Sequence, residues 1–338
     1  MSPVPIVSRS HRRPTKRHNT VVSSRLSTAL RLIAAAVVIA ACLWFVRQID
    51  LPVLGQALLR ASLPWVAVAA LLNFAQMLFR AWRLQALLRP VRTVGFGRLV
   101  RYGFAAAAAT NLLPARAGEV LRVWLLKARE GIPATTSVAV ALMEKVFDLV
   151  TLLVLVAPLP LLLPRLGQRF GWLFSLLVGT LVLLLGLALW VARRRSGSEE
   201  SLLGRFVLGT RVLQGGRPLG VTLATSLAVW LTDAAEVLLI LLALRIEVPA
   251  AAALLVLLTL NLAITLPSTP AQIGAFEGGA AWALVWLGVP KEAALAFALV
   301  YHVMQVVPVT LVGAPGLRLA LRAGAATVEQ GQSQKASE

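Results

Sequence analysis

The sequence predicts an all-α polytopic membrane protein, with about six full transmembrane helices and two re-entrant helical hairpins arranged as an inverted repeat. Of the 338 residues, 58% are hydrophobic and only 14% are charged, whereas soluble domains average about 25% charged residues. Several Leu- and Ala-rich stretches reach the roughly 18 residues that cross the hydrocarbon core of a bilayer as a helix. A transmembrane barrel would instead show short segments of alternating hydrophobicity.

Six uninterrupted apolar segments are expected to span the membrane, and they are 29–46, 65–82, 134–157, 172–192, 219–244 and 293–313. Two further apolar regions, 99–126 and 250–287, are interrupted by proline, glycine and charged residues. Neither half of either region is long enough to cross alone. We therefore expect each region to form a re-entrant hairpin, whose unpaired backbone is lined by protein or by a water-filled cavity.

Basic residues predict the orientation of the chain. Lys and Arg total 33 against 14 acidic residues, giving a net charge of +19, and they gather in the segments 80–101, 193–217 and 318–322. With a cytoplasmic N-terminus, the expected spans and hairpins place all of these segments in the cytoplasm, as the positive-inside rule requires. The charge therefore indicates a multi-pass protein of the inner membrane with both termini cytoplasmic, and no nucleic-acid partner.

The chain divides into two tails and one membrane domain. Residues 1–28 form a basic tail that we expect to be disordered, residues 29–322 form the transmembrane domain, and the polar residues 323–338 form a second disordered tail. Within the domain, 64–157 and 219–313 both follow the order span, hairpin, span. Because their hairpins enter from opposite sides, the two units are inverted repeats. Paired Gly/Pro-interrupted segments in such repeats point to a transport site near the midplane.

The two hairpin breaks carry residues that could bind a headgroup. These candidates are Asn111, Pro114, Arg116, Gly118 and Glu119 at the first break and Pro267, Gly274 and Glu277 at the second. Proline stops a helix and glycine permits the turn, so the next half-helix begins with free N–H groups and a positive dipole end. An anionic headgroup could bind there. The alternative is that both breaks are kinks without a ligand.

Ionisable residues inside the spans are the second group of candidates, because they are costly in a bilayer and commonly functional. This group comprises Arg80, Arg83, Arg122, Glu144, Lys145, Asp148, Asp233, Glu236 and His302. Glu144 with Asp148, and Asp233 with Glu236, each share one helix face, so each pair needs a basic partner or a shared proton. Arg116, Arg80 and Arg83 are the candidate bases in the first half of the chain. Glu144 follows Glu119 by 25 residues, and His302 follows Glu277 by the same 25. The alternative is that these charges only hold helices together.

Several enzyme classes lack their signatures in this sequence. There is no Gly-rich phosphate loop and no cluster of metal-ligand residues, and two of the three histidines lie in the N-terminal tail. We therefore expect no catalytic residues, no metal and no cofactor. Cys42 is the single cysteine, so an internal disulfide is excluded.

Four motifs give the chain a family resemblance. They are Arg80-Ala-Trp82-Arg83, the run from Pro114 through Gly118-Glu119 to Arg122, Glu144-Lys145-Val-Phe-Asp148, and the segment 267–277. Together they resemble the flippase-like membrane family that forms the transmembrane part of lysylphosphatidylglycerol synthases, over about residues 29–322. The family usually has arginine where Lys145 stands, and often arginine at the position of His302.

The resemblance implies a translocator that moves a phospholipid or another polar-headgroup lipid across the bacterial inner membrane. Its partners would be membrane lipids: an anionic phospholipid, a hopanoid or a lipid-linked sugar. The chain ends at Glu338 without the aminoacyl-transferring domain of the synthases, so we expect no lipid lysylation and no enzyme activity. The alternative is a non-transporting accessory subunit whose partner is a membrane-bound glycosyltransferase or a hopanoid- or lipid-modifying enzyme.

Overall fold

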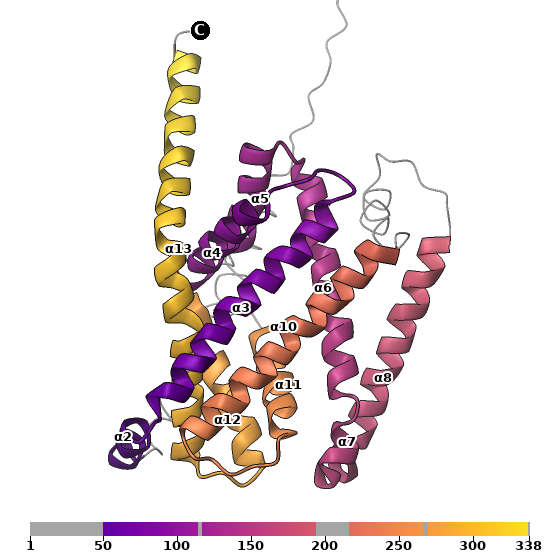
Figure 1. Cartoon of the computed structure of the whole chain (residues 1–338), viewed down its shortest axis with the longest axis vertical. Helices are drawn as coiled ribbons and strands as arrows, with labels where there is room; N and C mark the ends of the chain where they lie inside the picture. Colours follow the sequence, from indigo (N-terminus) through magenta and orange to yellow (C-terminus); the bar gives the residue numbers. More distant parts are fainter. Residues whose placement is uncertain (1–49, 114–116, 194–215, 266–269, 337–338) are drawn as a thin grey trace, which may run out of the picture. The chain divides into compact units, whose positions relative to one another are not determined.

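A computed structural model describes residues 50–113, 117–193, 216–265 and 270–336 of the chain (Figure 1). Within these residues the regular structure is helical and contains no strand, as the sequence predicts. The elements are α2 (Leu51–Leu59), α3 (Leu63–Leu88), α4 (Phe96–Leu112), α5 (Ala117–Glu130), α6 (Ala134–Val156), α7 (Leu159–Leu162), α8 (Pro164–Arg193), α10 (Gly216–Ala243), α11 (Ala252–Thr265), the 3-10 turn η1 (Pro270–Gln272), α12 (Ala275–Trp286) and α13 (Lys291–Ala336).

Four helical segments in the described part are long and apolar enough to cross a membrane: Leu63–Leu88, Pro164–Leu183, Arg217–Ala243 and Lys291–Arg322. They belong to α3, α8, α10 and α13 and coincide with four of the expected spans. The expected span 134–157 is helix α6, which has 23 residues but carries three charged side chains. The expected span 29–46 lies outside the described residues. The chain is thus a helical, multi-pass membrane protein.

Helix α13 is longer than the sequence analysis expects. It runs from Lys291 to Ala336 without interruption and includes Pro308 and Pro315, whereas the expected span ends at 313 and a disordered tail is expected from 323. A proline inside a transmembrane helix is tolerated because neighbouring groups satisfy the freed carbonyl. The segment after 323 is polar overall but includes Ala, Gln and Lys, which are good helix formers. Polarity therefore marks the end of the apolar segment and does not end the helix.

Both interrupted regions form pairs of short helices. In the first region α4 packs against α5, and in the second α11 packs against α12. Gly118 of α5 lies directly against the Ala106 carbonyl, and Gly279 of α12 lies directly against Leu260, so a Cβ at either glycine would collide with backbone. The absence of a side chain thus allows each pair to pack closely.

The second helix of each pair ends in the same way. Gly131 follows α5 with φ of 66°, and Gly288 follows α12 with φ of 93°. The amide of the next residue donates back into the helix in both cases, from Ile132 to Leu126 at 3.1 Å and from Val289 to Leu284 at 3.0 Å. This is a left-handed glycine cap, and a proline follows two residues after each glycine. The two interrupted regions therefore end with the same helix-capping motif.

Long-range packing joins the two halves of the sequence. Helix α3 has its most extensive contact with α10, and α4 has its most extensive contact with α13 (Figure 1). Gly313 of α13 lies directly against the Phe104 carbonyl of α4. Helix α4 also contacts η1, the turn that lies in the second break. Helix α4, which leads to the first break, therefore contacts the described turn of the second break, which is far away in sequence.

Candidate functional site

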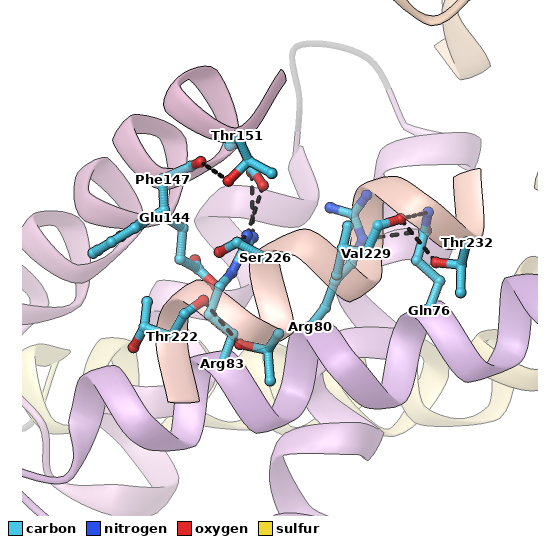
Figure 2. A network of polar contacts seen from close by, with 12 residues as sticks. Gln76, Arg80, Arg83, Glu144, Phe147, Thr151, Thr222, Ser226, Val229 and Thr232 are labelled. Carbon is cyan, nitrogen blue, oxygen red and sulfur yellow. Dashed lines mark hydrogen bonds and ion pairs between the residues drawn. The ribbon is translucent and has the colours of Figure 1, made fainter. Parts of the chain in front are cut away.

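A buried arginine holds α3, α6 and α10 together. Arg83 is 2% exposed, and its two terminal nitrogens donate to the carboxylate of Asp148 at 2.6 and 3.2 Å. One of these nitrogens also donates to the Ser226 hydroxyl at 3.1 Å. Figure 2 shows Arg83 of α3 facing Ser226 and Glu144 on the neighbouring helices. Two-point pairing of this kind fixes the relative position of the helices that carry the partners.

Arg80, one turn before Arg83 on α3, and Gln76, two turns before it, lie beside α10. Gln76 donates to the Val229 carbonyl at 3.4 Å and accepts from Arg80 Nε at 3.3 Å (Figure 2). The Arg80 guanidinium acts electrostatically on the carboxylates of Asp233 and Glu236. Arg80 thus supplies the positive charge that the sequence analysis expects beside this acidic pair.

The acidic pair itself lies at a junction of α3, α10 and α13. Gln305 Nε2 lies 3.2 Å from Asp233 Oδ1, 2.9 Å from Glu236 Oε2 and 3.1 Å from the Tyr301 hydroxyl. Asn73 donates to Gln305 Oε1 at 2.6 Å. Glu236 is fully buried, and its Oε1 has no hydrogen-bond partner.

The second break carries a glutamate–histidine pair. Gly274 takes φ of 90° just before α12 and donates its N–H to Glu277 Oε2 at 2.6 Å. Glu277 Oε1 lies 2.6 Å from His302 Nδ1, and His302 Nε2 lies 2.9 Å from the Ala271 carbonyl. The imidazole also stacks on Phe276, with ring centroids 4.3 Å apart. α13 is thereby attached to both sides of the break.

The first break carries two ion pairs of different character. Arg122 pairs with Glu144, whose side chain is 6% exposed. Glu119 and Lys145 lie 3.8 Å apart and are 52% and 64% exposed. Asn111 of this hairpin donates to Thr310 of α13 at 2.8 Å. Of these two described pairs, the one between Glu119 of α5 and Lys145 of α6 is therefore open to a ligand.

The structure brings the predicted site residues together only in part. Arg83 with Asp148, Arg122 with Glu144, and Glu277 with His302 are direct pairs. The 25-residue spacing thus corresponds to a direct contact between Glu277 and His302, whereas Glu119 and Glu144 each pair with a base. Three predicted candidates, Pro114, Arg116 and Pro267, lie outside the described residues.

The sequence analysis did not select Asn73, Gln76, Tyr301, Gln305 and Ser226 as site residues. The sequence feature that could have identified them is an uncharged polar side chain inside an otherwise apolar span, because such side chains hydrogen-bond across helices in membranes. Among the described residues, no group of three or more His, Cys, Asp or Glu side chains could hold a metal ion.

A pocket of about 350 Å³ opens where α3 ends and α10 begins. Its lining includes Trp82, Gln85, Thr93 and two exposed arginines, Arg89 and Arg217. Two guanidinium groups beside an aromatic ring are suited to an anionic headgroup at the membrane surface.

Comparison with known proteins places the chain among membrane proteins. The family model described as "Lysylphosphatidylglycerol synthase TM region" matches residues 31–313. The chain is also 26% identical over 312 residues to the protein named glycosyltransferase AglD from Haloferax volcanii, in an alignment that covers 78% of this chain and 50% of the relative. The chain thus spans about half the length of this curated relative.

Proposed function

We propose that this chain, which belongs to the lysylphosphatidylglycerol synthase transmembrane-region family, moves a polar-headgroup lipid across the bacterial inner membrane without changing it chemically. The observation that carries the proposal is the contact between α4, the helix that leads to the first break, and η1, the turn within the second break. The helices beside the breaks have 17, 14, 14 and 12 residues. A full span needs about 20 residues, so these lengths favour re-entrant hairpins.

An inverted repeat is part of the proposal. Its support is that both interrupted regions have close packing at a glycine and end in a left-handed glycine cap. Transporters with inverted repeats bind their substrates where discontinuous helices of the two repeats meet. Irregular backbone at membrane depth is tolerated only where protein covers it or where it lines a wet cavity. In the proposed topology, with both termini cytoplasmic, the lipid headgroup passes beside the two breaks.

The described ion pairs of the candidate site are of two kinds: buried pairs that hold helices together, and an exposed pair that is available to bind the lipid headgroup. Arg83 and Glu144 are almost fully buried, and removing their partners would leave costly uncompensated charges. Glu119 and Lys145 are half-exposed or more, and at 3.8 Å they bind each other weakly. In the proposed function the Lys145 ammonium receives the lipid phosphate, and the Glu119 carboxylate receives an amine or hydroxyl of the same headgroup.

The pocket lined by Arg89 and Arg217 is the proposed site where the lipid headgroup first binds. In the proposed topology it lies at the cytoplasmic surface, where anionic lipids gather around basic side chains. A phosphate held there would then be passed to the Lys145 ammonium. The whole route needs neither a nucleotide nor a catalytic residue, so the proposed function includes no group transfer.

The competing proposal is an accessory subunit that positions a membrane-bound glycosyltransferase and moves nothing. The observation in its favour is the name of the relative, a glycosyltransferase of which this chain covers half. A purified chain separates the two proposals, because only a translocator moves lipid without another protein.

The test uses the purified full chain in liposomes that contain fluorescently labelled phosphatidylglycerol or phosphatidylethanolamine. Movement is followed by chemical quenching of the label in the outer leaflet. We expect Glu119→Gln and Lys145→Gln to slow the movement by about tenfold or more, because a charge-assisted hydrogen bond contributes about 1.5–3 kcal/mol and about 1.4 kcal/mol equals a factor of ten. Lys127→Gln is the matched control, because Lys127 is an exposed lysine on α5.

The outcomes separate the proposals. Wild-type rates for well-folded Glu119→Gln and Lys145→Gln proteins would reject the site. The absence of lipid movement by the folded wild-type chain with either lipid would reject translocation of these lipids and favour the accessory subunit.

A further inference from the structure

The cluster around Asp233 and Glu236 contains two buried oxygens without a hydrogen-bond partner. Gln305 Nε2 serves the carboxylates of Asp233 and Glu236 and the Tyr301 hydroxyl, which carries a hydrogen of its own. The two oxygens without a partner are Glu236 Oε1 and Asn73 Oδ1. Buried polar atoms almost always have a partner, so a hydrogen is missing at these two atoms.

Turning the side-chain amides does not remove the deficit. If Asn73 is turned, its Nδ2 can donate to Glu236, but its oxygen then lies 2.6 Å from Gln305 Oε1, which is also an acceptor. If Gln305 is turned as well, its oxygen faces both carboxylates at the positions where Nε2 now lies. Each arrangement leaves two acceptors in contact, so the missing hydrogen must come from outside the amides.

The charge balance gives the same result. The charged and titratable groups that face the pair are Arg80 of α3, Tyr301 of α13 and Asp148 of α6, and Asp148 is already paired with Arg83. Helix α11, which also packs on α10, has no ionisable residue. Two carboxylates and one free-standing guanidinium leave one negative charge in excess. A single positive charge neutralises the cluster.

We infer that Asp233 and Glu236 form a buried proton-binding site that holds one exchangeable proton between α3, α10 and α13. The proton resides on Glu236 Oε1 and is donated to Asn73 Oδ1, the other oxygen without a partner; both side chains contact Gln305. Both unpartnered oxygens then acquire a partner. Because the two carboxylates interact, the proton belongs to the pair and can pass to Asp233.

The site would couple lipid movement to a proton gradient, and this second step rests on the proposed function. Loss of the proton leaves two charged carboxylates on adjacent turns of α10, which repel each other and attract Arg80. Gln305 connects this change to α13, the helix that also carries His302 at the second break. Proton binding itself needs no lipid movement, so it is tested separately.

The test is infrared spectroscopy of the full chain in lipid nanodiscs at neutral pH. A protonated carboxyl group gives a C=O stretch that ionised carboxylates lack. We expect this band in the wild type, its complete loss in Glu236→Gln, and a shift in Asn73→Ala, where the acceptor is gone. Glu292→Gln is the control, because Glu292 lies in the first turn of α13 and outside the cluster, so the band should remain unchanged.

Isotope labelling gives a readout that needs no variant. Carboxyl-¹³C glutamate should shift the wild-type band. Carboxyl-¹³C aspartate should shift it only if Glu236 shares the proton with Asp233. The inference is wrong if the wild type shows no protonated band, if neither label shifts it, or if Na⁺ at neutral pH removes it, which would indicate a sodium site. A band without lipid movement would reject the proposed function and leave the proton site standing.

Discussion

Replacement of Arg83 by methionine is the sharpest test of the packing between α3, α6 and α10. The variant loses three hydrogen bonds, two to Asp148 and one to Ser226. Interhelical hydrogen bonds in membranes average about 0.6 kcal/mol, so three would cost about 2 kcal/mol. The larger effect is that Asp148, only 17% exposed, keeps its charge without a partner. Breaking a buried pair in this way costs about 3–5 kcal/mol, and we expect that range.

A double-mutant cycle distinguishes these two contributions. Arg83→Met combined with Asp148→Leu removes both charges, so the double variant should recover most of the lost stability. The free energy of unfolding would be measured by steric trapping in bicelles. Arg89→Met is the control, because Arg89 is exposed at the end of the same helix and should change stability by about 0.5 kcal/mol or less. A double variant that loses the sum of the two single effects would refute the stranded-charge explanation.

Two further variants test the breaks. Gly118→Ala should destabilise the chain by about 1–3 kcal/mol, because the new methyl group meets the Ala106 carbonyl, whereas Gly171→Ala has open space and should be neutral or stabilising in the same unfolding measurement. Equal effects of the two would contradict the close packing of α4 and α5. Glu277→Ala removes the acceptor of both Gly274 N–H and His302 and should cost about 2–3 kcal/mol; an unchanged free energy of unfolding would show that α13 is not held to the break by this pair.

Much of the helix arrangement could be predicted from the sequence, because the signals are strong and local. The apolar stretches 65–82 and 219–244 exceed the length of a buried soluble helix, and both are helices in the structure. Proline and glycine located the two breaks to within a few residues. The end of α13 was missed because apolar composition reports the membrane thickness, whereas helix continuation depends on backbone propensity.

The site could be predicted less well, because partners across helices leave no local pattern. The sequence identified Asp148 as needing a base and included Arg83 among the candidates, but Arg80 and Arg116 fitted equally well. Asn73 and Gln305 are 232 residues apart, and no spacing rule connects them. Their contact becomes visible only when α3 and α13 are placed side by side.

The long reach of these contacts has a consequence for how the protein is made. Asn73 is inserted into the membrane with α3, yet its partner Gln305 is synthesised 232 residues later. Thr310, the partner of Asn111, is likewise synthesised 199 residues after it. At about 5–20 residues per second, both amides spend many seconds in the bilayer without their final partners. Ribosome stalling before α13 would therefore leave a nascent chain with unpaired polar groups in lipid, the kind of surface that membrane quality-control proteases encounter.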